Sequence, residues 1–226
     1  MAETMGSTLT FRPPTELPAC EPGCEGTGWY PSRDEHGREC VRPCPACQSR
    51  RLVAQFGCEI CTWASWVERP ELASAIEQLR AWRGGHEWAC LLHAGEGQLN
   101  RGSGKSHAMQ ATAHEWAARG VPVRYTAVPD LLERHRAAIG DASVRVPELE
   151  EFEGLLLLDD IGVGKATPWT QEILERLADF RRRHHLATLI STNKDLPRVE
   201  QEYPRLVDRC FEGLVIEWQA PSWRRR

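Results

Sequence analysis

The sequence predicts an α/β fold in which helices cover both faces of a parallel sheet, preceded by a small zinc-binding module. Residues 102–106 (Gly-Ser-Gly-Lys-Ser) lie between an expected strand and an expected helix. Residues 155–158 form a run of four leucines that ends in Asp159 and Asp160, and two close cysteine pairs occur before residue 50. Alternating strands and helices favour a parallel sheet, because each helix packs back onto the sheet before the next strand begins.

The chain divides by composition into four parts. Residues 1–18 are an expected disordered lead-in, rich in Pro, Thr and Glu, and residues 19–50 form the cysteine-rich module. Residues 51–87 are an expected linker with a helix over 71–83, where Leu72, Ile76 and Leu79 recur at helical spacing. Residues 88–226 form the main domain.

Within the main domain, apolar runs and turn residues predict the elements in order. We expect strands over 88–92, 121–128, 155–158, 187–192 and 214–218. We expect helices over 107–119, from 129 onward, over 170–186 and over 206–210, with Asp130 favouring a first helical turn. The continuous apolar run 155–158 is typical of a strand that is covered on both faces.

The composition limits the classes of function. The 226 residues suit one α/β domain with a small appendage. We see no secretory signal and no apolar run near the roughly 20 residues of a membrane span, so we expect a soluble cytoplasmic protein.

The formal net charge of −4 does not indicate a general nucleic-acid binder, so contact with DNA would depend on local patches. Candidates are the basic residues of 181–185 and 224–226, for which a solvated helix end and a frayed tail are equal alternatives. Tryptophans could stack on unpaired bases, although core packing explains most of them better; these are Trp63, Trp66, Trp169, Trp218 and Trp223.

The spacing Cys20-x3-Cys24 and Cys44-x2-Cys47 predicts a tetrahedral four-thiolate zinc site. In a reducing cytoplasm, clustered cysteines hold metal more often than they form disulfides. Reduced cysteines in a disordered arm are the alternative.

Other cysteines have less definite roles. His36 and Cys40 are further ligands within reach of the module, so one substitution in the ligand set stays open. Cys58 and Cys61 form a third pair, interpreted as small buried residues at a junction or as part of a second site. Cys90 and Cys210 are expected to be core thiols.

Residues 102–106 are typical of a phosphate-binding loop that opens a helix. Backbone N–H groups of Gly102, Ser103 and Gly104 would face the phosphates, Lys105 would reach the β- and γ-phosphates, and the Ser106 hydroxyl would ligate Mg²⁺. The strict pattern requires glycine at position 99, where Leu99 stands, so the loop is lengthened. A surface Gly/Ser turn is the alternative.

The acidic strand end supplies the second half of a nucleotide site. Asp159 is predicted to hold Mg²⁺, directly or through water, and Asp160 to polarise the attacking water. Asn193, at the end of a neighbouring strand, would orient water and sense the γ-phosphate, or it is a strand-end turn residue. Arg209 is a candidate arginine supplied to an adjacent subunit, with a surface salt bridge as the alternative.

The order of these motifs resembles the DnaC/DnaI-type helicase loaders of bacteria and phages, and the related IstB transposition helpers. The resemblance covers roughly residues 60–223 and rests on five segments: 102–107 (GSGKSH), 128–132 (VPDLL), 157–162 (LLDDIG), 188–193 (TLISTN) and 205–209 (RLVDR). The Cys-x-Gly-Thr-Gly-Trp and Pro-Cys-x-x-Cys segments resemble the N-terminal zinc module of some loaders.

The resemblance implies an AAA+ P-loop ATPase that uses ATP, Mg²⁺ and Zn²⁺, with His107 in the nucleotide-binding motif. It implies a replicative hexameric DNA helicase and single-stranded DNA as partners, self-association on either, and slow, partner-stimulated hydrolysis in a bacterial cytoplasm. The zinc module would dock on the helicase. Two other functions stay open: an ATPase helper of a transposase that assembles on duplex DNA, and a non-hydrolysing adaptor between helicase and DNA.

Overall fold

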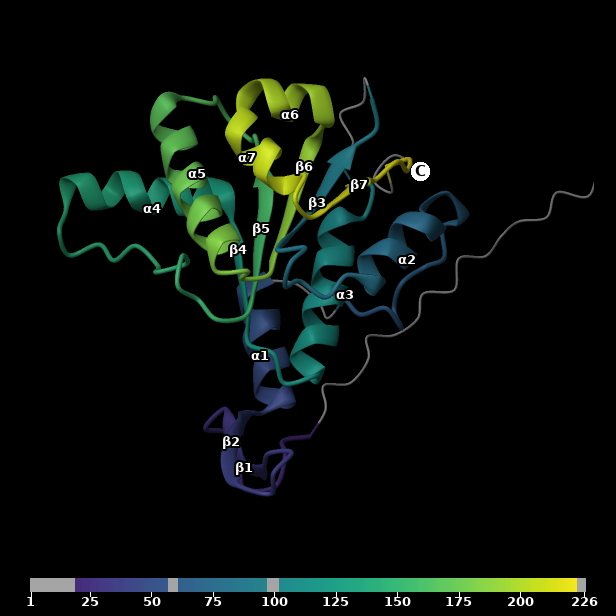
Figure 1. Cartoon of the computed structure of the whole chain (residues 1–226), viewed down its shortest axis with the longest axis vertical. Coiled ribbons are helices and arrows are strands. Elements are labelled where there is room, and N and C mark those ends of the chain that lie inside the picture. The colour runs from purple at the N-terminus through teal and green to yellow at the C-terminus, as the bar shows by residue number, and fades with distance from the viewer. Residues whose placement is uncertain (1–18, 57–60, 97–101, 223–226) are drawn as a thin grey trace, which may run out of the picture.

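The computed structural model describes residues 19–56, 61–96 and 102–222 (Figure 1). The main domain is built on a parallel five-stranded sheet in the order β4-β5-β6-β3-β7. Its strands are β3 (Ala89–Ala94), β4 (Val123–Ala127), β5 (Leu155–Ile161), β6 (Thr188–Asp195) and β7 (Leu214–Glu217). The predicted α/β class is therefore confirmed.

Helices cover both faces of the sheet, and each face has its own core. One core joins the sheet to α1 (Pro45–Phe56), α2 (Ala73–Ala81) and α3 (Lys105–Ala118). The other joins it to α4 (Val128–Gly140), α5 (Pro168–Arg183), α6 (Leu196–Glu202) and α7 (Pro204–Cys210). Side chains alternate along β5, so Leu155 and Leu157 enter the first core while Leu156 and Leu158 enter the second.

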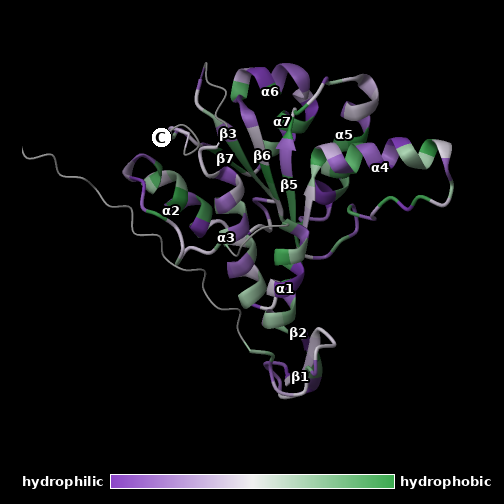
Figure 2. Ribbon diagram, turned by 180° about the vertical axis from the view of Figure 1, so that it is seen from behind, coloured by the Kyte–Doolittle hydropathy of each residue, from purple (hydrophilic) through white to green (hydrophobic). Residues whose placement is uncertain are grey.

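The helices of the second core are amphipathic, as α4 illustrates. Hydrophobic and hydrophilic residues alternate along α4 (Figure 2), and its buried side chains are Val128, Leu131 and Leu132. This spacing puts one apolar stripe against the sheet and leaves the polar face outside.

Several boundaries differ from the sequence-based expectation. β5 and β6 run three residues past their expected ends, to Ile161 and Asp195, because pairing resumes beyond an irregularity in register. Helix α5 begins earlier, at Pro168, because Thr167 caps it: the Thr167 side chain accepts a hydrogen bond from the Thr170 N–H at 3.2 Å. Helix α6 and the short 3₁₀ turn Pro70–Leu72 were not expected.

The N-terminal part consists of an antiparallel hairpin followed by α1. The hairpin strands are β1 (Trp29–Arg33) and β2 (Glu39–Pro43), and both lie at the end of the molecule away from the sheet (Figure 1). Helix α1 crosses position 50, where the sequence places the end of the module, and its Leu52 is fully buried in the first core. A single helix thus leads from the cysteine-rich hairpin to the sheet.

Arg181, one residue of the candidate basic patch over 181–185, does not lie at the surface. Its side chain is completely buried, and its guanidinium donates to the carbonyls of Leu149 (2.9 Å), Gly154 (3.1 Å) and Ala187 (2.8 Å) and to the Thr188 hydroxyl (2.8 Å). The five N–H donors of a guanidinium suit this task. Arg181 therefore fastens the segment before β5 to α5 and β6, and it offers no surface to nucleic acid.

Among the described residues, no helix is both long enough and apolar enough to cross a membrane.

Candidate functional site

The phosphate-loop residues lie where the chain enters α3. Gly104 is the N-cap of α3 with φ of +100°, a backbone conformation that favours glycine, and a Cβ there would lie 3.1 Å from the Trp66 ring. Ser103 and Lys105 are buried, whereas the Ser106 side chain is exposed at the first turn of the helix. The lengthened portion with Leu99 falls in 97–101, outside the described residues.

The backbone of the loop is fixed by Arg69 and Trp218, to which the sequence analysis assigned no contact with the loop. The Ser103 carbonyl accepts hydrogen bonds from Arg69 Nη1 at 3.0 Å and from Trp218 Nε1 at 3.2 Å. Arg69 Nη2 also donates to the Pro221 carbonyl at 2.8 Å. Because Arg69 precedes the main domain and Trp218 follows β7, both ends of the domain fix the backbone of the loop.

Lys105 lies close to the acidic end of β5. Its Nζ donates to Ser103 Oγ at 3.3 Å. Burial lowers the pKa of Lys105 to about 8, against the opposing effect of the negative charges of Asp159 and Asp160. The ammonium is thus a partly desolvated cation beside two carboxylates.

His107 packs into an aromatic cluster beside the loop. Its ring meets the ring of Trp66 edge-on, with centroids 5.0 Å apart, and Trp66 in turn contacts Trp63 and Trp218. Burial lowers the pKa of His107, and its buried Nε2 has no hydrogen-bond partner among the described residues. Trp218 is buried in the first core, and the partly buried Trp63 and Trp66 pack against it, which agrees with the packing role expected for most of the tryptophans.

Asp159 and Asp160 lie near the carboxyl end of β5, as the sequence predicted, and the strand continues one residue further to Ile161. Pairing between β5 and β6 shifts register between Leu158 and Ile161, and Asp160 has φ of +63°. A bulge of this kind re-aims side chains near a site, and a non-glycine residue in the left-handed region costs roughly 1–3 kcal/mol. The two carboxylates consequently have different surroundings.

The Asp159 carboxylate is buried and bonded at both oxygens. Oδ2 accepts the Tyr125 hydroxyl at 3.2 Å, and Oδ1 accepts the Ser191 hydroxyl and the Asp160 N–H, the latter at 3.1 Å. Burial, with the nearby charge of Asp159, raises the pKa of Tyr125, so its hydroxyl remains a donor at neutral pH. Residues of β4, β5 and β6 therefore orient the Asp159 carboxylate.

Asp160 is oriented by Asn193. The amide of Asn193 donates a hydrogen bond to Asp160 Oδ1 at 2.6 Å. This contact joins β5 to β6, the neighbouring strand on which the sequence placed Asn193. Lys194, the next residue, forms an ion pair with Glu202 of α6. β6 continues to Asp195, so Asn193 lies within the strand rather than in a turn at its end.

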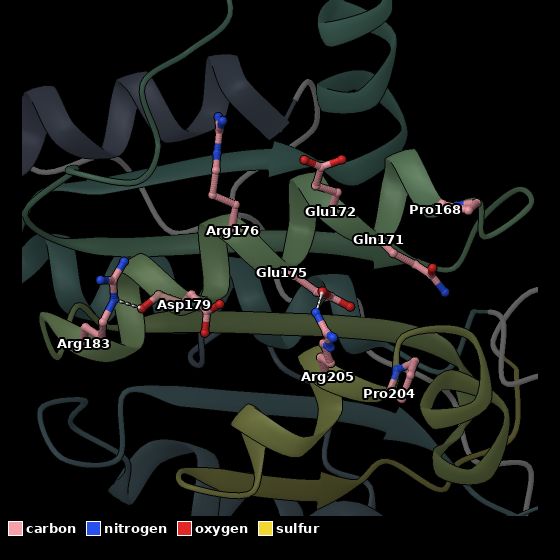
Figure 3. A pocket seen from close by; sticks show the side chains of 9 residues that line it. All are labelled: Pro168, Gln171, Glu172, Glu175, Arg176, Asp179, Arg183, Pro204 and Arg205. Carbon is pink, nitrogen blue, oxygen red and sulfur yellow. Dashed lines mark hydrogen bonds and ion pairs between the residues drawn. The ribbon is translucent and has the colours of Figure 1, made fainter.

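Arg209 lies on α7 and pairs with Asp179 of α5. Its Nη2 donates to Asp179 Oδ2 at 3.1 Å, and this hydrogen bond raises the pKa of Arg209. Asp179 lines a pocket of about 610 Å³ between α5 and α7 whose walls carry both charge signs (Figure 3). None of the residues 102–106 lines this pocket, and within one chain Arg209 forms an ion pair with Asp179.

The four cysteines predicted as zinc ligands converge. The sulfurs of Cys20, Cys24, Cys44 and Cys47 all lie within 4.8 Å of one another. Cys47 Sγ is 3.7 Å from Cys20 Sγ and 3.6 Å from Cys24 Sγ, and a tetrahedral zinc site with bonds of about 2.3 Å places sulfurs about 3.8 Å apart. The donor set and its geometry therefore fit Zn²⁺.

The charge around this cluster also favours a dication. Burial and the neighbouring sulfurs of Cys24, Cys20 and Cys44 raise the pKa of Cys47, because thiolates held this close without a cation would repel one another. Arg50 of α1 donates to Cys20 Sγ at 3.3 Å. Neither His36 nor Cys40 belongs to the group of metal-ligating residues found in the described part of the chain, and Cys58 lies outside that part.

The fold is similar to three solved structures of replication proteins. It matches DnaI with a TM-score of 0.58 and 17% identity, over 76% of this chain and 92% of DnaI. It matches the DnaC helicase loader with a TM-score of 0.57 and 16% identity, over 71% of this chain and 96% of that one. It matches the replication initiator DnaA, bound to AMPPCP and single-stranded DNA, with a TM-score of 0.57 and 19% identity over 70% of this chain.

The match covers 49% of the DnaA chain, so this chain spans about half the length of that initiator. No protein-family model matches the sequence, and neither does the sequence of any curated protein. The chain therefore shares the α/β fold of the DnaC and DnaI structures, as the resemblance implied.

Proposed function

We propose that this chain is an ATP-dependent loader that places a replicative hexameric helicase on single-stranded DNA. The observation that carries the proposal is the meeting of Lys105, Asp159, Asp160 and Asn193 at one end of the sheet. A cation at a helix start, two carboxylates and an amide on adjacent strands are the groups that phosphoryl transfer needs.

Each group has a proposed task. The N–H groups of residues 102–104 and the start of α3 would bind phosphate oxygens, and Lys105 would neutralise charge on the β- and γ-phosphates. Ser106 and Asp159 would hold Mg²⁺, which supplies the charge that draws electrons from the transferred phosphoryl group. Asp160 would accept a proton from the attacking water, with Asn193 fixing its orientation.

The cysteine cluster is proposed as a structural Zn²⁺ site with Cys20, Cys24, Cys44 and Cys47 as ligands. A closed four-thiolate set leaves no open position for chemistry. The hairpin it stabilises exposes Trp29 (47% exposed) and Val41 (69% exposed), which are apolar groups suited to contact another protein. We propose that this hairpin contacts the helicase.

The partners are inferred from the proteins that share this fold and from the charged residue Arg209. The similar DnaA structure holds a nucleotide analogue and single-stranded DNA, and the similar DnaC is a helicase loader. We propose the same two classes of partner for this chain, together with self-association in which Arg209 exchanges Asp179 for the nucleotide of a neighbouring copy.

The proposal is tested by measuring complex formation with the replicative helicase of the same organism. Light scattering after size-exclusion chromatography, with and without the analogue AMPPCP, should reveal a complex whose stability depends on nucleotide. Lys105→Ala should bind helicase but lose the nucleotide dependence. If neither the wild-type chain nor Lys105→Ala forms a complex with the helicase, while the wild type still binds ATP, the loader assignment is wrong and a transposase helper that assembles on DNA is favoured. If the wild-type chain binds no ATP, the non-hydrolysing adaptor is favoured.

A further inference from the structure

The edge of the sheet nearest the cysteine module is covered by α1. Cys47, a predicted zinc ligand, lies in the first turn of α1, and Arg50 on the next turn contacts the cysteine sulfurs. Leu52 is buried in the first core, and Phe56 at the end of the helix packs against the same core. The helix is therefore anchored to the cluster at one end and to the sheet at the other (Figure 1).

The last turn of α1 contacts Tyr125 of β4, which is an outer strand of the sheet. Gln55 Oε1 accepts a hydrogen bond from the Tyr125 backbone N–H at 2.9 Å. The rings of Phe56 and Tyr125 lie 4.3 Å apart between centroids at an interplanar angle of 45°. The backbone and the ring of Tyr125 are both positioned by α1.

The far end of the same side chain reaches the nucleotide site. The Tyr125 hydroxyl donates to Asp159 Oδ2 at 3.2 Å. The other Asp159 oxygen is held by Ser191 and by the Asp160 N–H, which belong to the sheet itself. Tyr125 is thus the one contact of Asp159 in the described structure that is itself held by the N-terminal helix.

We propose that Tyr125 is a positioning residue for the Mg²⁺-binding carboxylate of Asp159, and that α1 sets the position of Tyr125. The inference rests on the proposed function, because it takes Asp159 as a Mg²⁺ ligand. A partner that shifts the cysteine module would then change the position of the Mg²⁺-binding carboxylate of Asp159 without contacting the phosphate loop. The path runs from α1 through Phe56 and Tyr125 to Asp159.

The test is ATP binding by the full chain, measured by calorimetry over a series of Mg²⁺ concentrations and in EDTA. Tyr125→Phe keeps the ring against Phe56 and removes only the hydroxyl. The variant should raise about tenfold the Mg²⁺ concentration at which the effect of Mg²⁺ on ATP affinity is half-maximal. This is the loss of affinity expected when one hydrogen bond to a charged group is removed. Its affinity for ATP in EDTA should equal that of the wild type, which also shows that the variant is folded.

Tyr203→Phe is the matched control, because it removes a tyrosine hydroxyl that bonds Thr170 in the other core. It should leave the Mg²⁺ dependence unchanged. Phe56→Leu tests the contribution of α1 and should shift the Mg²⁺ dependence in the same direction by a smaller factor. The double variant with Tyr125→Phe should shift it no further than Tyr125→Phe alone, since both changes break one path.

Two results would overturn the inference, and a third would overturn the proposed function on which it rests. An unchanged Mg²⁺ dependence in Tyr125→Phe, with ATP binding intact, would remove the positioning role and leave the nucleotide site standing. Independent, additive effects of the two changes would remove the link to α1. A wild-type chain that binds no ATP at any Mg²⁺ concentration would instead overturn the proposed function itself.

Discussion

The Asn193 amide donates a hydrogen bond to Asp160 Oδ1 at 2.6 Å, between two strands that are neighbours in the sheet but separated by α5 in the chain. Asp160 has a left-handed backbone conformation within the strand, and this hydrogen bond helps to orient its carboxylate. Orientation of a proposed base by a second polar group is a common arrangement in hydrolytic sites.

Asn193→Ala should slow ATP hydrolysis about a hundredfold, the usual scale for losing oriented acid–base catalysis. ATP affinity should stay within a factor of about three, because the phosphate loop is intact. Steady-state hydrolysis and calorimetry measure the two quantities. Gln78→Ala is the control, since the Gln78 amide bonds only Ser74 on its own helix; a similar slowing there would remove any special role for Asn193.

ATP affinity should fall as the pH rises through about 8. Burial lowers the pKa of Lys105 to about 8, and only the charged ammonium attracts phosphate. The charged form predominates below this pKa and is lost above it, so affinity should weaken by up to about tenfold per pH unit beyond it. Titrations from pH 7 to pH 9.5 test this. Lys105→Arg, which does not titrate there, should show no such decline, and a flat wild-type profile would contradict the assignment.

Cys44→Ser should reduce bound zinc below one ion per chain and unfold the N-terminal hairpin, while the main thermal transition of the sheet domain persists. Loss of one thiolate leaves a three-ligand site and weakens a closed structural site. Cys40→Ser is the matched control, since Cys40 lies on β2 outside the cluster. Zinc content measured by atomic emission should be full in that variant; equal losses in both would mean a different ligand set.

Arg69→Ala should destabilise the main domain by about 2–4 kcal/mol and weaken ATP binding. The change removes charge-assisted hydrogen bonds to the Ser103 and Pro221 carbonyls from a side chain that is 4% exposed. Arg119→Ala removes an exposed ion pair with Glu115 and should cost less than about 1 kcal/mol. Urea unfolding and calorimetry measure both effects. Equal stability losses would show that Arg69 does not support the loop.

The fold was predictable because its signals are local and strong. Four leucines followed by two aspartates define β5, and the Gly-Ser-Gly-Lys-Ser segment marks the entry to α3. The ends of β5 and β6 were not predictable, because they depend on pairing between distant strands: Ile161 pairs with Thr192 and Ala94 pairs with Asp195, each beyond an irregularity in register. Arg181 looked like a surface arginine because its carbonyl partners come from a distant segment.

The proposed site was predictable only in part. The cysteine spacing predicted which four sulfurs converge, since short pairs restrict the geometry. Tyr125, Arg69 and Trp218 carry no motif, and their contacts with Asp159 and Ser103 arise only when strands and termini meet in the fold. Arg209, by contrast, lies in a motif that the sequence shows, but its ion-pair partner within one chain, Asp179, could not be predicted from that motif.

The most direct test of the account is helicase loading itself. The chain is mixed with the replicative helicase of its organism, ATP and forked DNA coated with single-strand-binding protein, and unwinding is recorded beside a Lys105→Ala control. The account predicts that wild type stimulates unwinding and that Lys105→Ala alters this stimulation. Equal unwinding with and without the chain, in a preparation that binds ATP, would contradict it.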